Sequence, residues 1–165
     1  MVFSDNLLQA RTQNTSKRIV REIIPRLKAL SSQELNFFTK CSSQEQGYLL
    51  WIAVCRRYRF IKDFAIEIIR EKYLSLKTEL NRDDYDAFFN QKSEWHPELV
   101  DIRSSTRNKL RQVLFKCLRE ADILTDNNNI NAPILSPLFI KTISHHNSMD
   151  ILLLPVFELD LGRLE

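Results

Sequence analysis

Glycine is scarce in this sequence: among its 165 residues there are only two, Gly47 and Gly162. An all-β protein would need many more glycines for its turns, so we expect helices to dominate the fold. The sequence also lacks a glycine-rich phosphate loop, a nucleophile elbow and a zinc-protease helix. The sequence therefore offers none of these three signatures of an enzyme.

Cysteine is also scarce, and the uninterrupted apolar runs are short. Cys41, Cys55 and Cys117 have no two-residue spacing, so they suggest neither a zinc site nor a disulfide framework, and we expect free thiols. The longest apolar run, residues 48–55, falls well short of the roughly 18 to 20 residues that cross a bilayer. The first residues do not have the pattern of a secretory signal. We therefore expect a cytoplasmic protein with no membrane segment, metal or cofactor.

Charge is plentiful and unevenly distributed along the chain. Charged residues make up 27% and hydrophobic residues 44% of the sequence, an ordinary globular composition with a net charge of +3. Residues 1–30 carry six basic and two acidic side chains, and residues 91–120 carry seven basic and four acidic ones. Residues 121–165 carry two basic and six acidic side chains. A polyanion is the natural partner if the two basic blocks share one face.

Helical spacing of apolar residues dominates residues 1–77. A first helix is predicted over residues 16–30, kinked at Pro25, with basic side chains on its outer face. Ser31 and Ser42 are each followed three residues later by glutamate, so two further helices should begin directly after them. The second of these includes residues 48–55, which are apolar all round and predict a central buried helix. Helical spacing continues to about residue 76, either as one helix or as two with a bend near residue 59.

Asn81 marks the start of the next predicted helix. Asparagine is a favourable N-cap, and acidic side chains in the first turn oppose the positive end of the helix dipole. The acidic residues of this turn are Asp83, Asp84 and Asp86. A divalent-metal cluster is the alternative interpretation, but no glycine turn or ordered ligand spacing supports it.

Residues 88–135 have the order expected of a helix-turn-helix with a hairpin wing. The helix before Pro97 should end near Trp95, a hydrophobic plug, and Ser104 or Ser105 should cap a new helix. This new helix has basic flanks, and its N-terminal end, where a recognition helix contacts bases, carries short polar groups. Its apolar stripe is predicted to face a core. The stripe comprises Leu110, Val113, Leu114, Cys117, Leu118 and Ala121.

Two short apolar runs follow, at residues 123–124 and 130–135, on either side of the polar residues 125–129. Asparagine and aspartate tolerate left-handed backbone conformations, so this pattern is typical of a hairpin turn. Pro133 restricts its strand to the edge of a sheet. We interpret the segment as a β-hairpin wing, and a plain loop between two helices is the alternative.

The predicted fold class is therefore all-α, mainly helical, with a small β-hairpin wing. Residues 1–77 are expected to form an N-terminal helical-bundle lobe, and residues 78–165 a winged helix-turn-helix-like lobe. One compact unit is the alternative organisation. Two short helices, beginning at Ser136 and Ser148, should complete the chain.

Candidate DNA contacts come from three of the predicted helices. On the first helix and the recognition helix, basic side chains flank an apolar stripe, and the run from Arg56 to Lys62 interleaves cations with aromatic rings. The alternative interpretation of this run is the solvated end of a buried helix whose arginines pair with Asp63 and Glu67. The complete candidate set is Lys17, Arg18, Arg21, Arg56, Arg57, Arg59, Lys62, Arg103, Ser105, Thr106, Arg107, Asn108, Lys109, Arg111 and Lys116.

Four stretches of the sequence carry a family resemblance. They are NLLQARTQNTSKRIVREIIPRLKALS, LLWIAVCRRYRFIKDFAIEIIREKYL, DAFFNQKSEWHPEL and SSTRNKLRQVLFKCLREADIL. In number and order they resemble the small BrxA proteins of BREX bacteriophage-exclusion systems, over about residues 6–157. The resemblance implies a largely helical protein with helix-turn-helix character that binds double-stranded DNA and has no assigned catalytic residues. Members usually carry a further helical segment before the first stretch, whereas here only residues 1–5 precede it.

The expected function is a non-enzymatic, double-stranded DNA-binding component of a BREX-type phage-defence system, with other BREX proteins as further partners. The alternative hypothesis is an adaptor that docks larger components of the defence assembly. Its motivation is the apolar surface of residues 151–157, which exceeds what a small domain is expected to bury. The DNA sequence preference, the oligomeric state and the step of defence stay open.

Overall fold

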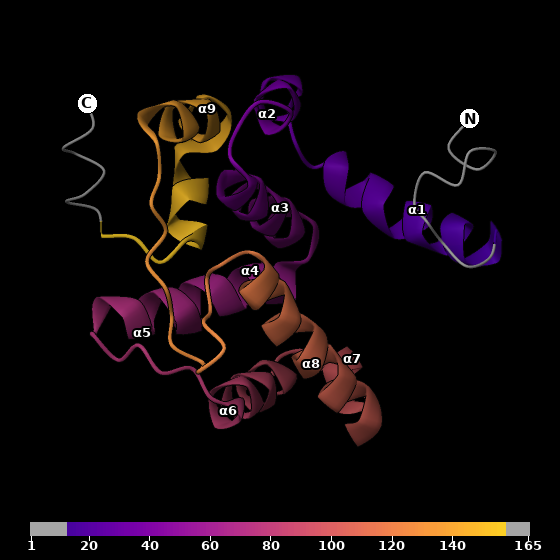
Figure 1. Ribbon diagram of the computed structural model, residues 1–165. Helices are drawn as coiled ribbons and strands as arrows, with labels where there is room; N and C mark the ends of the chain where they lie inside the picture. Colours follow the sequence, from indigo (N-terminus) through magenta and orange to yellow (C-terminus); the bar gives the residue numbers. More distant parts are fainter. Residues whose placement is uncertain (1–12, 158–165) are drawn as a thin grey trace.

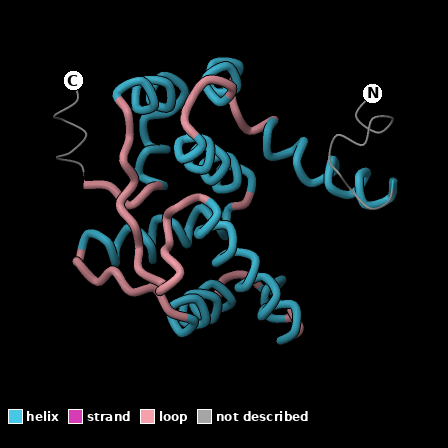
Figure 2. The backbone as a smooth tube through the Cα atoms, viewed as in Figure 1, coloured by secondary structure: helices cyan, strands magenta, loops and turns pink. Residues whose placement is uncertain are grey.

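The computed structural model describes residues 13–157, which form a succession of helices joined by short loops (Figure 1, Figure 2). Within this range the β pairing consists of two isolated antiparallel bridges, Glu79 with Asn129 and Leu124 with Ile130. The prediction of a mainly helical fold is confirmed. No helix in this part of the chain combines the length and the apolar character that a membrane span requires.

The elements before residue 77 are α1 (Gln13–Leu27), α2 (Ser32–Phe38), α3 (Ser43–Arg57), α4 (Arg59–Phe64), the π-helix η1 (Ala65–Arg70) and α5 (Glu71–Leu74). Ser31 and Ser42 cap α2 and α3 through complete capping boxes, as predicted. α3 ends where Tyr58 adopts an extended backbone, with φ −123° and ψ 104°. Of the two predicted alternatives, the structure therefore has two helices, because α3 ends at Arg57 and α4 begins at Arg59. α4, η1 and α5 then follow one another directly.

The elements after residue 77 are α6 (Arg82–Ser93), α7 (Pro97–Val100), α8 (Ser104–Glu120), α9 (Pro137–Asn147) and the 3-10 helix η2 (Ser148–Leu153). Asn81 caps α6 in a box with Asp84, and Ser136 caps α9, as predicted. The predicted cap of α8 is wrong, because Arg103 occupies the N-cap position and no side chain caps the helix there.

α3 passes through the centre of the core, as the apolar residues 48–55 predicted (Figure 1). Tyr48 and Ile52 are completely buried, and Trp51 Nε1 donates a 2.9 Å hydrogen bond to the carbonyl of Leu153. The buried side chains form one cluster that includes residues from before and after residue 77. The division into two lobes at that residue stays a prediction.

The predicted hairpin wing does not form paired strands among the described residues. A turn closes over residues 125–129, where the N–H of Thr125 donates to the carbonyl of Asn129 at 2.9 Å. The N–H of Ile130 does not pair within this turn, and it donates to the carbonyl of Thr78 at 2.7 Å. Pro133 then has no N–H to offer, so pairing stops after the single bridge on each side. The sequence identified the turn correctly and the strands incorrectly.

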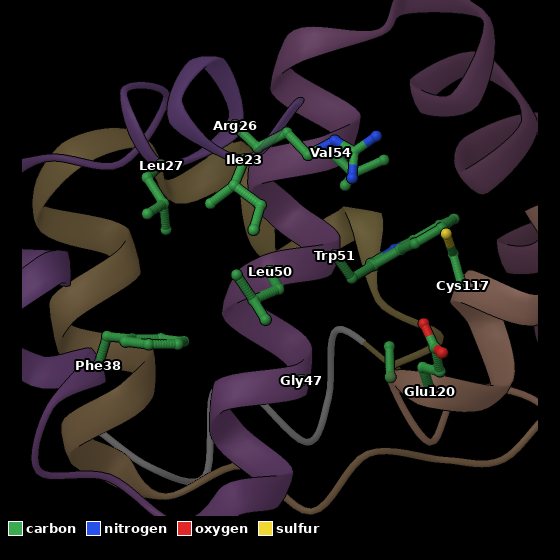
Figure 3. A pocket seen from close by; sticks show the side chains of 11 residues that line it. Ile23, Arg26, Leu27, Phe38, Gly47, Leu50, Trp51, Val54, Cys117 and Glu120 are labelled. Atoms are coloured by element: carbon green, nitrogen blue, oxygen red, sulfur yellow. The ribbon is translucent and has the colours of Figure 1, made fainter. Parts of the chain in front are cut away.

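The predicted apolar stripes of α1 and α8, and the predicted buried segment of α3, each include partly exposed residues. Ile23 and Ile24 of α1 are 37% and 45% exposed, Leu110 and Val113 of α8 are 45% and 46% exposed, and Leu50 of α3 is 41% exposed. The prediction that the apolar stripe of α8 faces a core is confirmed for Leu114, Leu118 and Ala121, which are buried, and is wrong for Leu110 and Val113. The three helices instead surround an open cavity of about 420 Å³ (Figure 3).

Two further predictions about apolar side chains are also wrong. Trp95 is 79% exposed, so it does not plug the end of α6. Residues 151–157 were expected to offer surplus apolar surface, but Ile151, Leu153 and Leu154 are almost completely buried. These residues belong to the core because η2 packs back against η1, α3 and α9.

Candidate nucleic-acid interface

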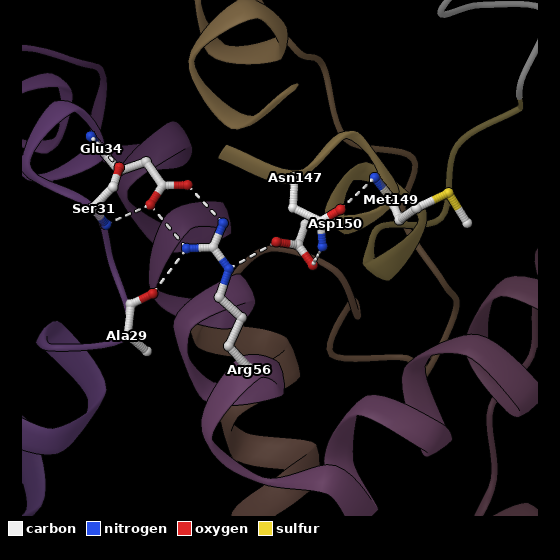
Figure 4. Close-up of polar contacts among 7 residues, drawn as sticks. All are labelled: Ala29, Ser31, Glu34, Arg56, Asn147, Met149 and Asp150. Carbon is white, nitrogen blue, oxygen red and sulfur yellow. Dashed lines mark hydrogen bonds and ion pairs between the residues drawn. The ribbon is translucent and has the colours of Figure 1, made fainter. Parts of the chain in front are cut away.

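Arg56 lies inside the protein rather than on its surface (Figure 4). Its Nη2 and Nη1 atoms contact the Glu34 carboxylate at 2.6 and 2.8 Å, and its Nε contacts the Asp150 carboxylate at 2.8 Å. Nη1 also donates to the carbonyl of Ala29 at 2.9 Å. The guanidinium joins α3 to the start of α2 and to η2. We therefore correct the prediction that Arg56 contacts DNA, because its side chain is occupied and only 12% exposed.

The two carboxylates around Arg56 are deeply buried, and the partners of Glu34 keep its carboxylate ionised. Burial is the largest influence on Glu34 and raises the pKa of its carboxyl group. Hydrogen bonds from Arg56 and Ser31, together with the positive charge of Arg56, outweigh burial and hold this pKa below its ordinary value. Asp150 also accepts a 3.1 Å hydrogen bond from Asn147. These contacts make a buried ion-pair network whose role is structural.

Arg107 and Arg111, both predicted to contact DNA, point toward α6. Arg107 Nη2 lies 3.0 Å from Asp86 Oδ1, and Nη1 donates to the side-chain oxygen of Asn90 at 2.8 Å. Arg111 pairs with the second oxygen of the same aspartate. The Arg107 guanidinium also covers the ring of Phe89, 4.4 Å from its centroid. Both arginines fasten α8 to α6, so we remove them from the candidate DNA-binding surface.

An exposed polar stripe runs along another face of α8. Ser105, Lys109, Gln112 and Lys116 recur at three- and four-residue intervals, which places them on one side of the helix, and all four are exposed. We call these four residues the α8 stripe. Lys116 lies 3.5 Å from Glu120, and both side chains are largely exposed. The other exposed candidates near the start of α8 are Arg103, Thr106 and Asn108.

The candidates on α1 are exposed as predicted. Lys17, Arg18 and Arg21 face solvent along this helix, which extends away from the core (Figure 1). α1 and α8 both reach to the same side of α3 in this view, and side chains of both helices line the cavity between them. The tertiary structure thus brings the two helices that carry the basic blocks to the same side of α3 in this view.

The remaining candidates surround the junction of α3 and α4. The Arg57 guanidinium lies over the ring of Tyr58, 5.5 Å from its centroid. Arg59 is 85% exposed and lies 3.9 Å from Asp63, a weak pair that the solvated-face interpretation anticipated. Lys62 is exposed as well. Of the four candidates at this junction, Arg57, Arg59 and Lys62 are exposed and able to contact a phosphate, and Arg56 is not.

Two polar residues of this side were not in the predicted set. Gln112 completes the α8 stripe, and its helical spacing from Lys109 and Lys116 was the signal that would have identified it. Arg26 of α1 shares the Tyr58 ring with Arg57, at 5.8 Å from the centroid. No sequence pattern indicates this second contact, because α1 meets the junction only in the folded protein.

Comparisons with known proteins point to one family. A family profile described as BrxA matches residues 1–147 of the chain. The chain is similar to the BREX protein BrxA of Escherichia coli, with 28% identity over 138 residues that cover 82% of this chain and 65% of that protein. It is also similar to the BREX protein BrxA of Bacillus cereus, with 25% identity over 146 residues that cover 87% and 72% of the two proteins. The chain spans less than two thirds of the length of the Escherichia coli protein.

A solved structure shares the fold. It is that of an uncharacterized protein from Magnetospirillum magneticum, with a TM-score of 0.77 and 18% sequence identity. The match covers 93% of this chain and 80% of that one. At this identity the likeness concerns the arrangement of the helices alone.

Proposed function

The chain belongs to the BrxA family, and on that premise we propose that it is a non-enzymatic, double-stranded DNA-binding component of a BREX-type phage-defence system. In this proposal α6, α7 and α8 act as a helix-turn-helix-like unit, and α8 is the helix that contacts the duplex. The observation that carries the proposal is the α8 stripe, because its lysines are exposed and its N-terminal end carries short polar groups.

The dimensions of α8 suit a contact with duplex DNA. Its 17 residues make a helix about 25 Å long, at about 1.5 Å per residue. Lys109 and Lys116 stand about 10 Å apart along its axis. The major groove admits one helix, and phosphates line both of its edges, so both ammonium groups are able to reach the backbone. Ser105 and Gln112 lie between and beside them as hydrogen-bonding groups toward base edges.

Exposed cations outside α8 support the same proposal. Lys17, Arg18 and Arg21 on α1, and Arg57 and Arg59 at the α3–α4 junction, are exposed. In this proposal these cations contact phosphates and hold the protein on the duplex without reading its sequence. We propose that they extend the interface beyond the α8 stripe.

A salt titration tests the proposal directly. Each lost phosphate contact lowers the slope of log affinity against log salt by about 0.9. Lys109→Ala with Lys116→Ala should therefore lower the slope by about 1.8 and weaken binding measured by electrophoretic shift. The matched control is Lys40→Ala with Lys141→Ala, which removes the same charge from exposed positions on α2's C-terminal side and on α9.

Two results would contradict the proposal. Absence of binding by the unaltered protein at about 50 mM salt would exclude duplex DNA as its ligand, since non-specific binding is strongest at low salt. Equal loss in the stripe variant and in its control would mean that net charge matters and the α8 stripe does not. Thermal melts of both variants exclude unfolding as the cause.

The adaptor function loses the observation that first favoured it. Residues 151–157 lie largely in the core, so they do not offer a docking surface in the folded protein. A docking role therefore requires a different surface.

A further inference from the structure

The N-terminal half of α8 lies largely outside the core. Of the ten residues 104–113, eight are exposed, and the two exceptions are Arg107 and Arg111. The C-terminal half begins with Leu114 and Phe115, which are buried in the core. Apolar packing therefore anchors one end of α8. The other end lies at the periphery of the molecule, and its contacts with the rest of the protein centre on two arginines (Figure 1).

Both arginines meet a single carboxylate of α6. Arg107 Nε donates to Asp86 Oδ1 at 3.1 Å, and Arg107 Nη2 donates to the backbone carbonyl of Asp86 at 2.8 Å. Arg111 Nη1 donates to the other carboxylate oxygen, Oδ2. Hydrogen bonds between ionised groups are stronger than those between neutral ones. We call Asp86, Arg107 and Arg111 the α6–α8 clasp.

The clasp fixes the rotation of α8 about its own axis. Arg107 and Arg111 are four residues apart, so they point to the same side of the helix. Lys109 is two residues from each of them, which is about 200° around a helix with about 3.6 residues per turn. While the clasp holds the arginines on α6, Lys109 and the exposed α8 stripe are therefore turned away from α6 and toward solvent.

A phosphate is poorly placed to take the arginines from Asp86. Arg107 contacts the carboxylate and the carbonyl of Asp86, the side-chain oxygen of Asn90 at 2.8 Å, and the ring of Phe89 at 4.4 Å from its centroid. A phosphate would have to replace all of these contacts at once. The clasp therefore stays closed when the α8 stripe meets the duplex.

We propose that Asp86 is a positioning residue for DNA binding. Through the clasp it orders the first half of α8 and presents the α8 stripe before the duplex arrives. A helix that is already ordered binds more tightly than one that is ordered on binding, because the loss of conformational freedom has occurred during folding. This inference rests on the proposed DNA-binding function and adds to it a residue that does not itself contact DNA.

The sign of one substitution tests the inference. Asp86→Asn removes a negative charge, and on electrostatic grounds alone this change should strengthen binding to a polyanion. Loss of the clasp should instead weaken binding about tenfold in electrophoretic shift, because the helix must then be ordered on the duplex. The salt slope should stay unchanged, since Lys109 and Lys116 still reach phosphates in the complex.

Two further variants serve as controls. Asp83→Asn makes the same charge change at an exposed position of α6, three residues before Asp86, and should bind DNA at least as tightly as the unaltered protein. Asp86→Glu keeps a carboxylate for the arginines. It should bind more tightly than Asp86→Asn although it carries one more negative charge.

Hydrogen exchange supplies a readout that does not depend on DNA. In Asp86→Asn the backbone amides of residues 108–113 should exchange at least about tenfold faster than in the unaltered protein. The amides of residues 114–120 should exchange at an unaltered rate, because apolar packing anchors them. A general loss of stability would accelerate both halves of α8 and would contradict a local ordering role.

The remaining results that would overturn the inference concern affinity. Tighter binding by Asp86→Asn, with a salt slope raised by about 0.9 for each arginine that reaches a phosphate, would assign Arg107 and Arg111 to the duplex. Equal affinity of Asp86→Asn, Asp83→Asn and the unaltered protein would mean that the clasp has no role in binding, and the proposed function would stand. Absence of DNA binding by the unaltered protein would overturn the proposed function and this inference together.

Discussion

Replacing Arg56 should destabilise the protein strongly without weakening DNA binding by the folded form. Arg56→Met keeps much of the side-chain volume and removes the positive charge. Two carboxylates then lose their partner: Glu34 is completely buried, and the side chain of Asp150 is only 4% exposed. Breaking a buried ion pair by removing one partner costs about 3–5 kcal/mol. For a domain of this size that corresponds to a fall in melting temperature of about 6–20 °C.

Acidification provides a second, independent signature. In the unaltered protein the pKa of Glu34 is held below its ordinary value, so its stabilising contribution is complete at neutral pH and is lost only as the pH falls through the lowered pKa. In Arg56→Met the burial that raises the pKa of Glu34 is no longer outweighed, so the pKa should lie above its ordinary value. The variant should then gain stability as the pH falls from 7 toward 5, and the difference from the unaltered protein should narrow.

The assay is urea unfolding at several pH values, with Arg57→Met as the control. Arg57 is the next residue along the chain, is exposed and lies over the Tyr58 ring, so its replacement should change stability by no more than about 0.5 kcal/mol. Similar stabilities of the two variants at pH 7, or a difference that widens on acidification, would refute the argument that Arg56 serves the core. Reduced DNA affinity of folded Arg56→Met would restore it to the interface.

Three further predictions follow from other contacts. Arg107→Ala with Arg111→Ala should lower the melting temperature, because α8 loses its ties to Asp86, and should leave the salt slope of DNA binding unchanged; a slope lower by about two would place both arginines on phosphates. Asn81→Ala should destabilise by about 0.5–2 kcal/mol in urea unfolding with an unaltered m-value, and a negligible effect would mean that the capping box contributes nothing. Burial raises the pKa of the Cys55 thiol, so thiol reagents should label it only after unfolding, and rapid labelling of the native protein would show that α3 opens.

The sequence by itself determined most features whose partners lie within four residues, and the cap of α8 is the exception. The caps at Ser31, Ser42, Asn81 and Ser136 formed as predicted, because a cap joins a side chain to a backbone N–H of the same turn. The central helix over residues 48–55 was predictable for a similar reason, since a segment that is apolar all round favours burial, although the folded protein leaves Leu50 41% exposed.

Tertiary structure decided which cations are free and which apolar faces are covered. Arg56 and Arg57 are neighbours in sequence with the same charge, yet only Arg56 meets Glu34, 22 positions away, and Asp150, 94 positions away. The candidates on α8 divided in the same way, because Asp86 of α6 faces Arg107 and Arg111 and does not face Lys109. Helical periodicity gives the direction of a side chain relative to its own helix. Whether that direction ends at a carboxylate, an open groove or solvent depends on another segment, because burial and pairing are properties of two surfaces brought together.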